Sequence, residues 1–245
     1  MDDWKRLTFH MIDAMVAAAQ DDLVHFAQHV AWAVPNPDVL DKIVRFVRAL
    51  PLGSRGVLSV GAGLGCWEAL MDASGLAIEI TDKFTVRYNS MCFPDSVAFG
   101  DDQVLLTRAE VDKLPTFCQV EQLGHRTALA KYGSTSSVLF LCYPANQCDC
   151  GCGDDHNEMA FESLELFSGQ RVIYIGPGAP RVAPDEGSAP RDDPLAGKEK
   201  QCTVATPRFF HLLDTRFVLE QKLPLHVFKS HESTPAFVWL YVRKQ

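Results

Sequence analysis

The sequence predicts an α/β protein, a Rossmann-like three-layer sandwich in which helices cover both faces of a doubly wound, mostly parallel sheet. Short apolar runs of strand type alternate along the chain with segments of helical periodicity, which is typical of parallel strands joined by crossover helices. A glycine-rich turn at 61–65 joins the first apolar run to a helical segment. The last two strand-type runs have no helix between them, so we expect an antiparallel hairpin at the end.

The N-terminal part of the chain is predicted to be helical. Apolar residues recur with helical spacing over the first thirty residues, and a second helix is expected after Asn36, a favourable N-cap that precedes Pro37. Pro51 and Gly53 end this second helix. We therefore expect residues 1–53 to form a helical segment packed on a Rossmann-like domain at 54–245.

The remaining elements follow in order along the domain. Strands are predicted at 57–60, 76–81, 117–121, 138–142, 171–175, 217–223 and 236–242, and helices at 159–167 and 207–213. Between the fifth strand and the last helix the composition changes to Pro, Gly, Asp and Ala, so residues of about 177–200 are expected to form a mobile surface loop.

The glycine turn is the most informative motif of the chain. The strand Val57–Val60 leads directly into Gly61, Gly63 and Gly65, and Asp82 ends the next strand, 21 residues after Gly61. The first glycine permits a sharp exit from the strand, and the next lets a ligand lie against bare backbone. An acid at about this distance accepts hydrogen bonds from two ribose hydroxyls. The pattern predicts a half-site for a nucleoside cofactor, with an ordinary strand-to-helix turn as the alternative.

The spacing of the glycines bears on which cofactor is bound. Dinucleotide folds favour G-x-G-x-x-G, in which the pyrophosphate lies on the helix N-terminus. Here the third glycine, Gly65, comes one residue early and Cys66 takes its place. The G-x-G-x-G spacing favours S-adenosylmethionine, which has no phosphate to bind, and disfavours an NAD(P)-dependent oxidoreductase.

Composition and charge exclude several classes of protein. The chain of 245 residues is 47% hydrophobic and has a formal net charge of −8, so one substantial core is expected and a nucleic-acid substrate is unlikely. No segment is typical of a signal peptide or a membrane span. Eight cysteines without a secretory signal indicate a reduced, cytoplasmic compartment. The oligomeric state is not predicted.

Several motifs together carry a family resemblance over roughly residues 30–243. They are Val34-Pro35-Asn36, Gly61 to Trp67, Asp82, Leu139 to Pro144, Met159-Ala160-Phe161-Glu162-Ser163-Leu164, Val172-Ile173-Tyr174-Ile175-Gly176, and the tail from Phe209-Phe210-His211 to Leu240-Tyr241-Val242-Arg243. With these motifs the chain resembles the class I S-adenosylmethionine-dependent methyltransferases, and within them a poorly characterised methyltransferase-like group. The resemblance implies a sheet of seven strands, the last of them antiparallel.

The cofactor site is expected where the carboxyl ends of the first and fourth strands meet and the strand order reverses. The expected cofactor-binding residues are Gly61, Ala62, Gly63, Leu64, Gly65, Asp82, Leu123, Gly124 and Cys142. Trp67 is expected to pack on the second strand, the alternative being that it lines the cofactor pocket. Two positions depart from the family pattern: Gly124 stands where an acid meets the adenine edge, and Pro177 replaces a carboxylate. By resemblance, backbone groups of 123–125 would still contact adenine.

Two side chains are candidates for catalysis. Tyr143 follows the fourth strand and is expected to face the methylsulfonium or to hydrogen-bond the acceptor, the alternative being a Tyr that packs on a helix. His125 is a candidate general base for a hydroxyl acceptor, the alternative being a solvated loop histidine.

A local cluster of thiols offers a weaker metal hypothesis. Cys148, Cys150, Cys152 and His156 provide four zinc-type ligands, but their C-x-C-x-C spacing lacks the two-residue gap of a zinc knuckle. An exposed, redox-sensitive loop is the favoured interpretation, and no metal is predicted.

The leading functional prediction is transfer of a methyl group from S-adenosylmethionine to a small molecule or a protein side chain. The absent acids at Gly124 and Pro177 leave an alternative, a catalytically degenerate cofactor-binding homologue that acts as a partner or regulator. A nicotinamide-dependent oxidoreductase is the third and least favoured hypothesis.

Overall fold

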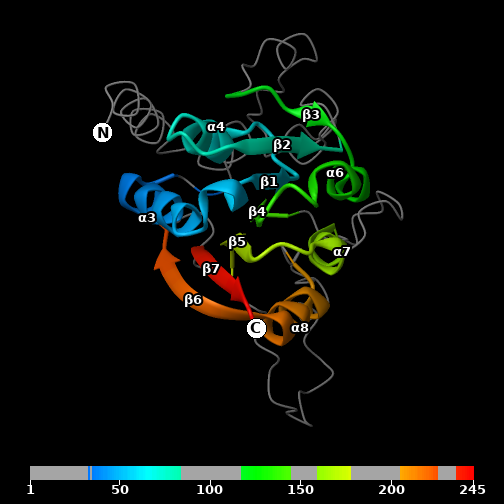
Figure 1. Cartoon of the computed structure of the whole chain (residues 1–245). Helices are drawn as coiled ribbons and strands as arrows, with labels where there is room; N and C mark the ends of the chain where they lie inside the picture. The colour runs from blue at the N-terminus through cyan, green and yellow to red at the C-terminus, as the bar shows by residue number, and fades with distance from the viewer. Residues whose placement is uncertain (1–32, 34, 84–116, 145–158, 178–204, 226–235) are drawn as a thin grey trace, which may run out of the picture.

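The computed structural model describes residues 33, 35–83, 117–144, 159–177, 205–225 and 236–245. Within these ranges the strands form one seven-stranded sheet in the order β3-β2-β1-β4-β5-β7-β6 (Figure 1). The strands are β1 (Val57–Val60), β2 (Ile78–Asp82), β3 (Glu121–Gln122), β4 (Val138–Cys142), β5 (Arg171–Gly176), β6 (Phe217–Pro224) and β7 (Phe237–Arg243).

The strand directions confirm the predicted topology. Strands β1 to β5 pair in parallel, whereas β7 runs antiparallel to both β5 and β6. The expected terminal hairpin is therefore β6–β7, and the sheet has the seven strands with an antiparallel last strand that the resemblance implied. β1 lies between β2 and β4, so the strand order reverses beside it, and ligands of such sheets bind outside the carboxyl ends at this point.

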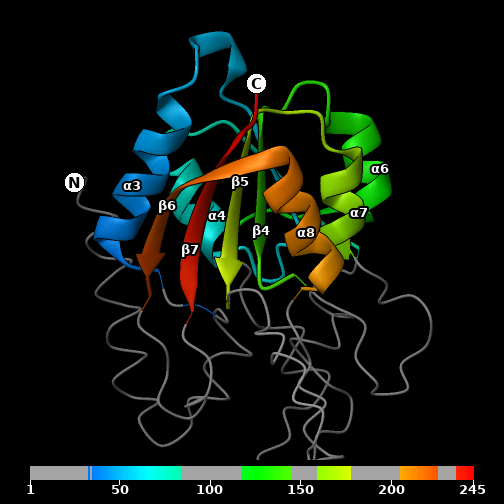
Figure 2. The ribbon, with the colours of Figure 1, turned by 90° about the horizontal axis from the view of Figure 1, so that it is seen from below.

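Helices cover both faces of the sheet, which confirms the three-layer sandwich. The described helices are α3 (Pro37–Arg48), α4 (Cys66–Asp72), α6 (His125–Tyr132), α7 (Met159–Leu166), α8 (Pro207–Arg216) and the short 3-10 helix η1 (Leu52–Ser54). Figure 2 shows α3 and α4 on one face and α6, α7 and α8 on the other. Alternate strand residues enter two separate cores: Val57 and Phe140 pack toward α3 and α4, while Leu58 and Leu139 pack toward the other three helices.

Helix α3 begins where the sequence predicts. Asn36 Oδ1 accepts hydrogen bonds from the backbone N–H groups of Asp38 at 2.9 Å and Val39 at 3.3 Å. Pro37 occupies the first turn, where its missing N–H costs no hydrogen bond. The apolar face of the helix is buried in the core on its side of the sheet.

The predicted strand at 117–121 is wrong in extent. β3 comprises only Glu121 and Gln122. The residues before it are directed to the glycine turn instead: the Phe117 N–H donates to the Leu64 carbonyl at 3.1 Å, and the Cys118 thiol donates to the Gly65 carbonyl at 3.4 Å. A segment that covers the turn in this way cannot also pair along β2.

Parts of the sequence predictions concern residues outside the described ranges. These are the helical periodicity of the first thirty residues and the loop expected at about 177–200, apart from Pro177 itself. Both stay predictions.

Candidate cofactor site

The turn after β1 requires its glycines for their backbone conformation. Gly61, Gly63 and Gly65 have φ angles of 75°, 56° and 74°. This left-handed region costs a residue with a β-carbon about 1–2 kcal/mol, whereas glycine adopts it readily. Three left-handed residues at alternate positions reverse the chain between the end of β1 and the start of α4.

Backbone and carboxylate groups at the end of β2 hold this turn. The N–H groups of Gly61 and Ala62 donate to the Thr81 carbonyl at 2.9 and 3.1 Å. The next donor, the Gly63 N–H, points to the carboxylate of Asp82, with Oδ2 at 2.9 Å, and Asp82 is buried. The structure thus places the predicted acid directly against the predicted glycine turn.

Two sulfur-containing side chains pack against the outer glycines of the turn. A β-carbon on Gly61 would lie 2.8 Å from Met159 Cε, and one on Gly65 would lie 2.3 Å from Cys118 Sγ. These distances are shorter than van der Waals contact. The backbone at these two positions is therefore bare because side chains of the protein itself approach it.

A buried carboxyl group that the sequence reasoning assigned no role lies next to the turn. Glu68, in the first turn of α4, is 2% exposed, and its Oε1 lies 2.7 Å from Ser59 Oγ of β1. Burial is the main cause that raises the pKa of Glu68 from 4.5 to about 7, and the charge of Asp82 adds to it. The signal in the sequence was a lone acid inside the apolar segment 66–71.

Cys66 and Trp67, next to the turn, belong to the core, whereas Cys118 is partly buried. Trp67 is 1% exposed and its Nε1 donates to the Ala33 carbonyl at 2.8 Å, which confirms the prediction that it packs. Burial raises the pKa of the Cys118 thiol to about 12 and raises that of the Cys66 thiol as well. Both groups are therefore neutral thiols near pH 7, which are weak nucleophiles.

Tyr143 follows β4 in an unusual backbone conformation. Its φ is 45°, which is the only positive value of a non-glycine residue in the described ranges. Its N–H donates to the Ile175 carbonyl at 2.8 Å, and its side chain packs against the core together with that of Cys142. Burial raises the pKa of Tyr143 above its ordinary value, so the hydroxyl stays protonated near pH 7. Strained backbone of this kind is concentrated at functional sites.

The end of β3 lies beside the end of β2. The Leu123 N–H donates to the Asp82 carbonyl at 2.8 Å, so the predicted adenine-side residues adjoin the predicted ribose acid. Gly124 caps α6 with φ −66°, and no atom lies within 4 Å of where its β-carbon would be. At the other departure from the family pattern, the Pro177 carbonyl accepts from the Tyr174 hydroxyl at 3.0 Å.

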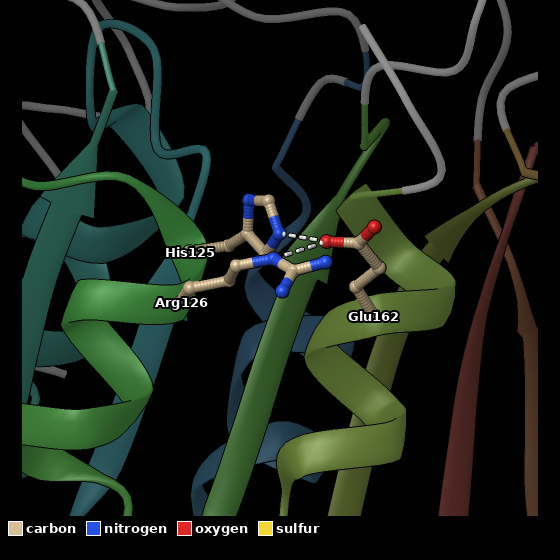
Figure 3. A network of polar contacts seen from close by, with 3 residues as sticks. All are labelled: His125, Arg126 and Glu162. Atoms are coloured by element: carbon tan, nitrogen blue, oxygen red, sulfur yellow. Dashed lines mark hydrogen bonds and ion pairs between the residues drawn. The ribbon is translucent and has the colours of Figure 1, made fainter. Parts of the chain in front are cut away.

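His125 belongs to a polar cluster that joins α6 to α7 (Figure 3). Its Nε2 lies 2.5 Å from Glu162 Oε2, and Arg126 Nε donates to the same oxygen at 2.9 Å. The hydrogen bond from Arg126 is the main cause that holds the pKa of Glu162 below its usual value, and the contact with His125 contributes as well. Glu162 lay within a motif that carried the resemblance, but nothing in the sequence indicated its partner. The two candidate catalytic residues follow different strands: His125 comes after β3 and Tyr143 after β4. Strands β2 and β1 lie between β3 and β4 in the sheet.

The metal hypothesis concerns residues that lie outside the described ranges, because Cys148, Cys150, Cys152 and His156 all fall within 145–158. Among the residues that are described, no group of three or more His, Cys, Asp or Glu side chains is placed to hold a metal ion. The described helices also include none that is long and apolar enough to cross a membrane.

Comparisons with known proteins give structural matches only. No protein-family model and no curated protein sequence matches the chain. Magnesium protoporphyrin IX methyltransferase from Synechocystis PCC 6803, solved with S-adenosylmethionine, is 15% identical over 84% of this chain and 79% of that one, with a TM-score of 0.43.

Two further solved structures are similar at the same level. An O-methyltransferase from Bacillus cereus, in complex with S-adenosylhomocysteine, is 14% identical over 96% of this chain and 90% of that one, with a TM-score of 0.45. The N-methyltransferase NodS from Bradyrhizobium japonicum WM9, also with S-adenosylhomocysteine, is 6% identical over 86% and 90%, with a TM-score of 0.45. The strand order and strand directions of the chain itself are what show a Rossmann-like fold of the class I methyltransferase type.

Proposed function

We propose that this protein binds S-adenosylmethionine and transfers its methyl group to a small molecule or a protein side chain. The observation that carries the proposal is the contact between the Asp82 carboxylate and the Gly63 N–H at 2.9 Å. It brings an acid suited to two ribose hydroxyls against a turn whose third glycine, Gly65, comes one residue earlier than in the dinucleotide-binding pattern. Strand ends that lie apart in the sequence meet here at the reversal of strand order, where such folds bind ligands.

The residues present fit the cofactor in a definite arrangement. Asp82 would accept from the ribose, and the turn at 61–65, which includes Ala62 and Leu64, would lie along the rest of the nucleoside. Cys142 ends β4 and Tyr143 follows it, and β4 neighbours β1 on the side away from β2, so the two residues would face the sulfur end. When bound, the cofactor would supply a methyl carbon on a sulfonium, open to in-line attack by an acceptor atom, with the thioether S-adenosylhomocysteine as the leaving group.

The contribution of the protein to this chemistry is alignment and exclusion of water. The neutral Tyr143 ring is suited to lie against a cationic sulfonium, and its hydroxyl is suited to donate to an acceptor atom. The left-handed backbone conformation of Tyr143 sets the direction of its side chain relative to β4. We assign Tyr143 to the acceptor side of the site.

A second candidate function is that of a cofactor-binding homologue without turnover. Gly124 supplies no carboxylate at the end of β3, and the Pro177 carbonyl is engaged by the Tyr174 hydroxyl. Both features would weaken binding of the cofactor. A partner or regulator that does not turn over would tolerate weaker binding. The cytoplasmic location and the identity of the acceptor stay predictions in either case.

Isothermal titration with S-adenosylmethionine, S-adenosylhomocysteine and NAD tests the proposed cofactor. We expect micromolar binding of the first two and none of NAD. Asp82→Asn should weaken binding, and Glu79→Ala, which removes an exposed carboxylate from the same strand, serves as the matched control. Formation of S-adenosylhomocysteine with pooled small-molecule and protein acceptors then separates an enzyme from a degenerate homologue. Failure of the wild-type protein to bind either sulfur nucleoside would refute the proposal.

A further inference from the structure

Two aromatic side chains and a lysine lie together on the terminal β6–β7 hairpin. Lys222 of β6 pairs with Trp239 of β7, and Phe237 lies two residues before Trp239 and therefore on the same face. The Lys222 Nζ lies 3.8 Å from the centre of the Phe237 ring and 4.3 Å from the centre of the Trp239 ring. The two ring centres are 5.6 Å apart, with the rings edge to face. We call these three side chains the hairpin cluster.

The end of β5 connects the hairpin cluster to Tyr143. Two consecutive carbonyl groups accept hydrogen bonds there, that of Ile175 from the Tyr143 N–H at 2.8 Å and that of Gly176 from Trp239 Nε1 at 3.2 Å. Because β7 runs antiparallel to β5 and Phe237 pairs with Gly176, β7 begins at the edge where β4 and β5 end. In Figure 2, β4, β5, β7 and β6 follow one another across the sheet. The hairpin cluster therefore lies on the side of Tyr143 that is away from β1.

The Lys222 ammonium is held in place but is accessible to an anion. Its side chain is exposed, and none of the ion pairs among the described residues includes it. The two rings contact the ammonium without neutralising its charge. Phe237 and Trp239 are only partly buried, so apolar surface lies next to the charge, and Pro177 after Gly176 adds no negative charge. Such a surface suits a ligand that has both an apolar part and an anionic group.

The distance from the hairpin cluster to the proposed methyl position limits the size of this ligand. Neighbouring strands lie about 4.8 Å apart and β5 separates β4 from β7, so the ends of β4 and β7 are about 10 Å apart. A molecule whose nucleophilic atom lies beside Tyr143 and whose anionic group reaches Lys222 must span about this distance. An elongated small molecule does so. This step rests on the proposed function, since it takes a sulfonium beside β4 as given.

We propose that the methyl acceptor is a small, elongated apolar molecule with an anionic group, which the hairpin cluster binds through Lys222 while the nucleophilic atom lies beside Tyr143. Lys222 would select the acceptor and take no part in the transfer of the methyl group. Phe237 and Trp239 would hold the ammonium and cover the apolar part of the acceptor. Of the two acceptor classes in the proposed function, this inference selects the small molecule.

The test is titration calorimetry of the protein saturated with S-adenosylhomocysteine. The probes are 4-hydroxycinnamate and its amide, which share ring and hydroxyl and differ in charge. We expect the wild-type protein to bind the carboxylate about two- to fivefold more tightly than the amide, the range for an exposed ion pair. Lys222→Gln should reduce this preference to nearly one. Lys222→Arg keeps the positive charge and should keep the preference.

Two further variants separate the charge from the apolar surface. Lys42→Gln removes an exposed lysine from α3 and should leave the preference unchanged. Phe237→Leu should weaken binding of both probes by a similar factor, because it removes aromatic surface and leaves the ammonium. Affinity for S-adenosylhomocysteine should stay at the wild-type value in each variant, since β4 and β5 lie between the hairpin and β1. Thermal unfolding verifies that each variant is folded.

The outcomes distinguish this inference from the proposed function. If the wild-type protein binds S-adenosylhomocysteine but shows no preference for the carboxylate, the inference is overturned and the cofactor proposal stands. The same holds if folded Lys222→Gln keeps the preference, because Lys222 would then only stabilise the hairpin. Absence of S-adenosylhomocysteine binding by the wild-type protein would overturn both.

Discussion

Ser59 Oγ of β1 and Glu68 Oε1 of α4 lie 2.7 Å apart in the interior of the protein, next to the glycine turn. This hydrogen bond joins β1, which precedes the glycine turn, to α4, which follows it. Because Glu68 is buried and no Lys, Arg or His side chain of the described residues forms an ion pair with it, its ionised form is disfavoured. The consequence is a dependence of stability on pH.

Glu68 should lower the stability of the protein as the pH rises. The pKa of its carboxyl is about 7 in the folded protein and near 4.5 when exposed, so between these values the folded state binds the proton that the unfolded state has lost. The free energy of unfolding therefore falls across this window, by an amount on the order of 3 kcal/mol. Urea unfolding at pH 5 and pH 8 measures the difference.

The substitution Glu68→Gln should abolish most of this difference, because an amide keeps the shape and the hydrogen bond to Ser59 without a charge. The exposed Glu165 provides the matched control, and Glu165→Gln should leave the pH dependence in place. An equal fall in stability for Glu68→Gln and the wild-type protein would show that Glu68 is not its source.

Gly65 should tolerate no β-carbon. Its φ of 74° is strained for alanine, and the new atom would lie 2.3 Å from Cys118 Sγ. We expect Gly65→Ala to reduce the free energy of unfolding by about 2 kcal/mol or more and to weaken binding of S-adenosylhomocysteine. Gly124→Ala is the control, since its φ is −66° and its surroundings are open. Equal stabilities of the two variants in urea unfolding would contradict the structure of the turn.

Ser163 should be replaceable by alanine without loss of stability. Its Oγ in α7 is fully buried, and no described residue accepts or donates a hydrogen bond to it. Removing such a hydroxyl relieves a desolvation cost, so Ser163→Ala should be neutral or more stable by about 1 kcal/mol. Ser59→Ala should have the opposite effect because it removes the hydroxyl donor of the buried Glu68 carboxyl. A clear loss of stability in Ser163→Ala would indicate a partner for this hydroxyl outside the described residues.

Tyr143 should distinguish a sulfonium from a thioether. A cation–π contact contributes about 0.5–1 kcal/mol at a partly exposed site, which corresponds to about a two- to fivefold change in affinity. We expect Tyr143→Leu to weaken binding of S-adenosylmethionine by this factor relative to S-adenosylhomocysteine. Tyr143→Phe retains the ring and should keep the wild-type ratio. Titration calorimetry with both nucleosides gives the ratio of the two affinities for each variant. If Tyr143→Leu weakened the binding of both ligands equally, the Tyr143 ring would not lie against the sulfonium.

Much of the fold was predictable because its signals are local. The run Val138–Cys142 is apolar at every position, as a central strand buried on both faces requires, and Asn36 with Pro37 marks the start of α3 by its own hydrogen bonds. The segment at 117–121 was predicted less well. Its apolar residues fit a strand, but Cys118 packs on Gly65, a contact across 53 residues that no local pattern reveals.

The sequence by itself determined most of the elements, their order and the glycine turn followed by an acid, because backbone conformation and hydrophobic periodicity are properties of neighbouring residues. It did not indicate helix α6 (His125–Tyr132). Only the tertiary structure decided which distant groups meet. The contact of His125 with Glu162 spans 37 residues, and that of Gly63 with Asp82 spans 19. Such pairs depend on how helices pack across the sheet and how strands align, since side chains of fixed length reach only what packing brings within about 3 Å.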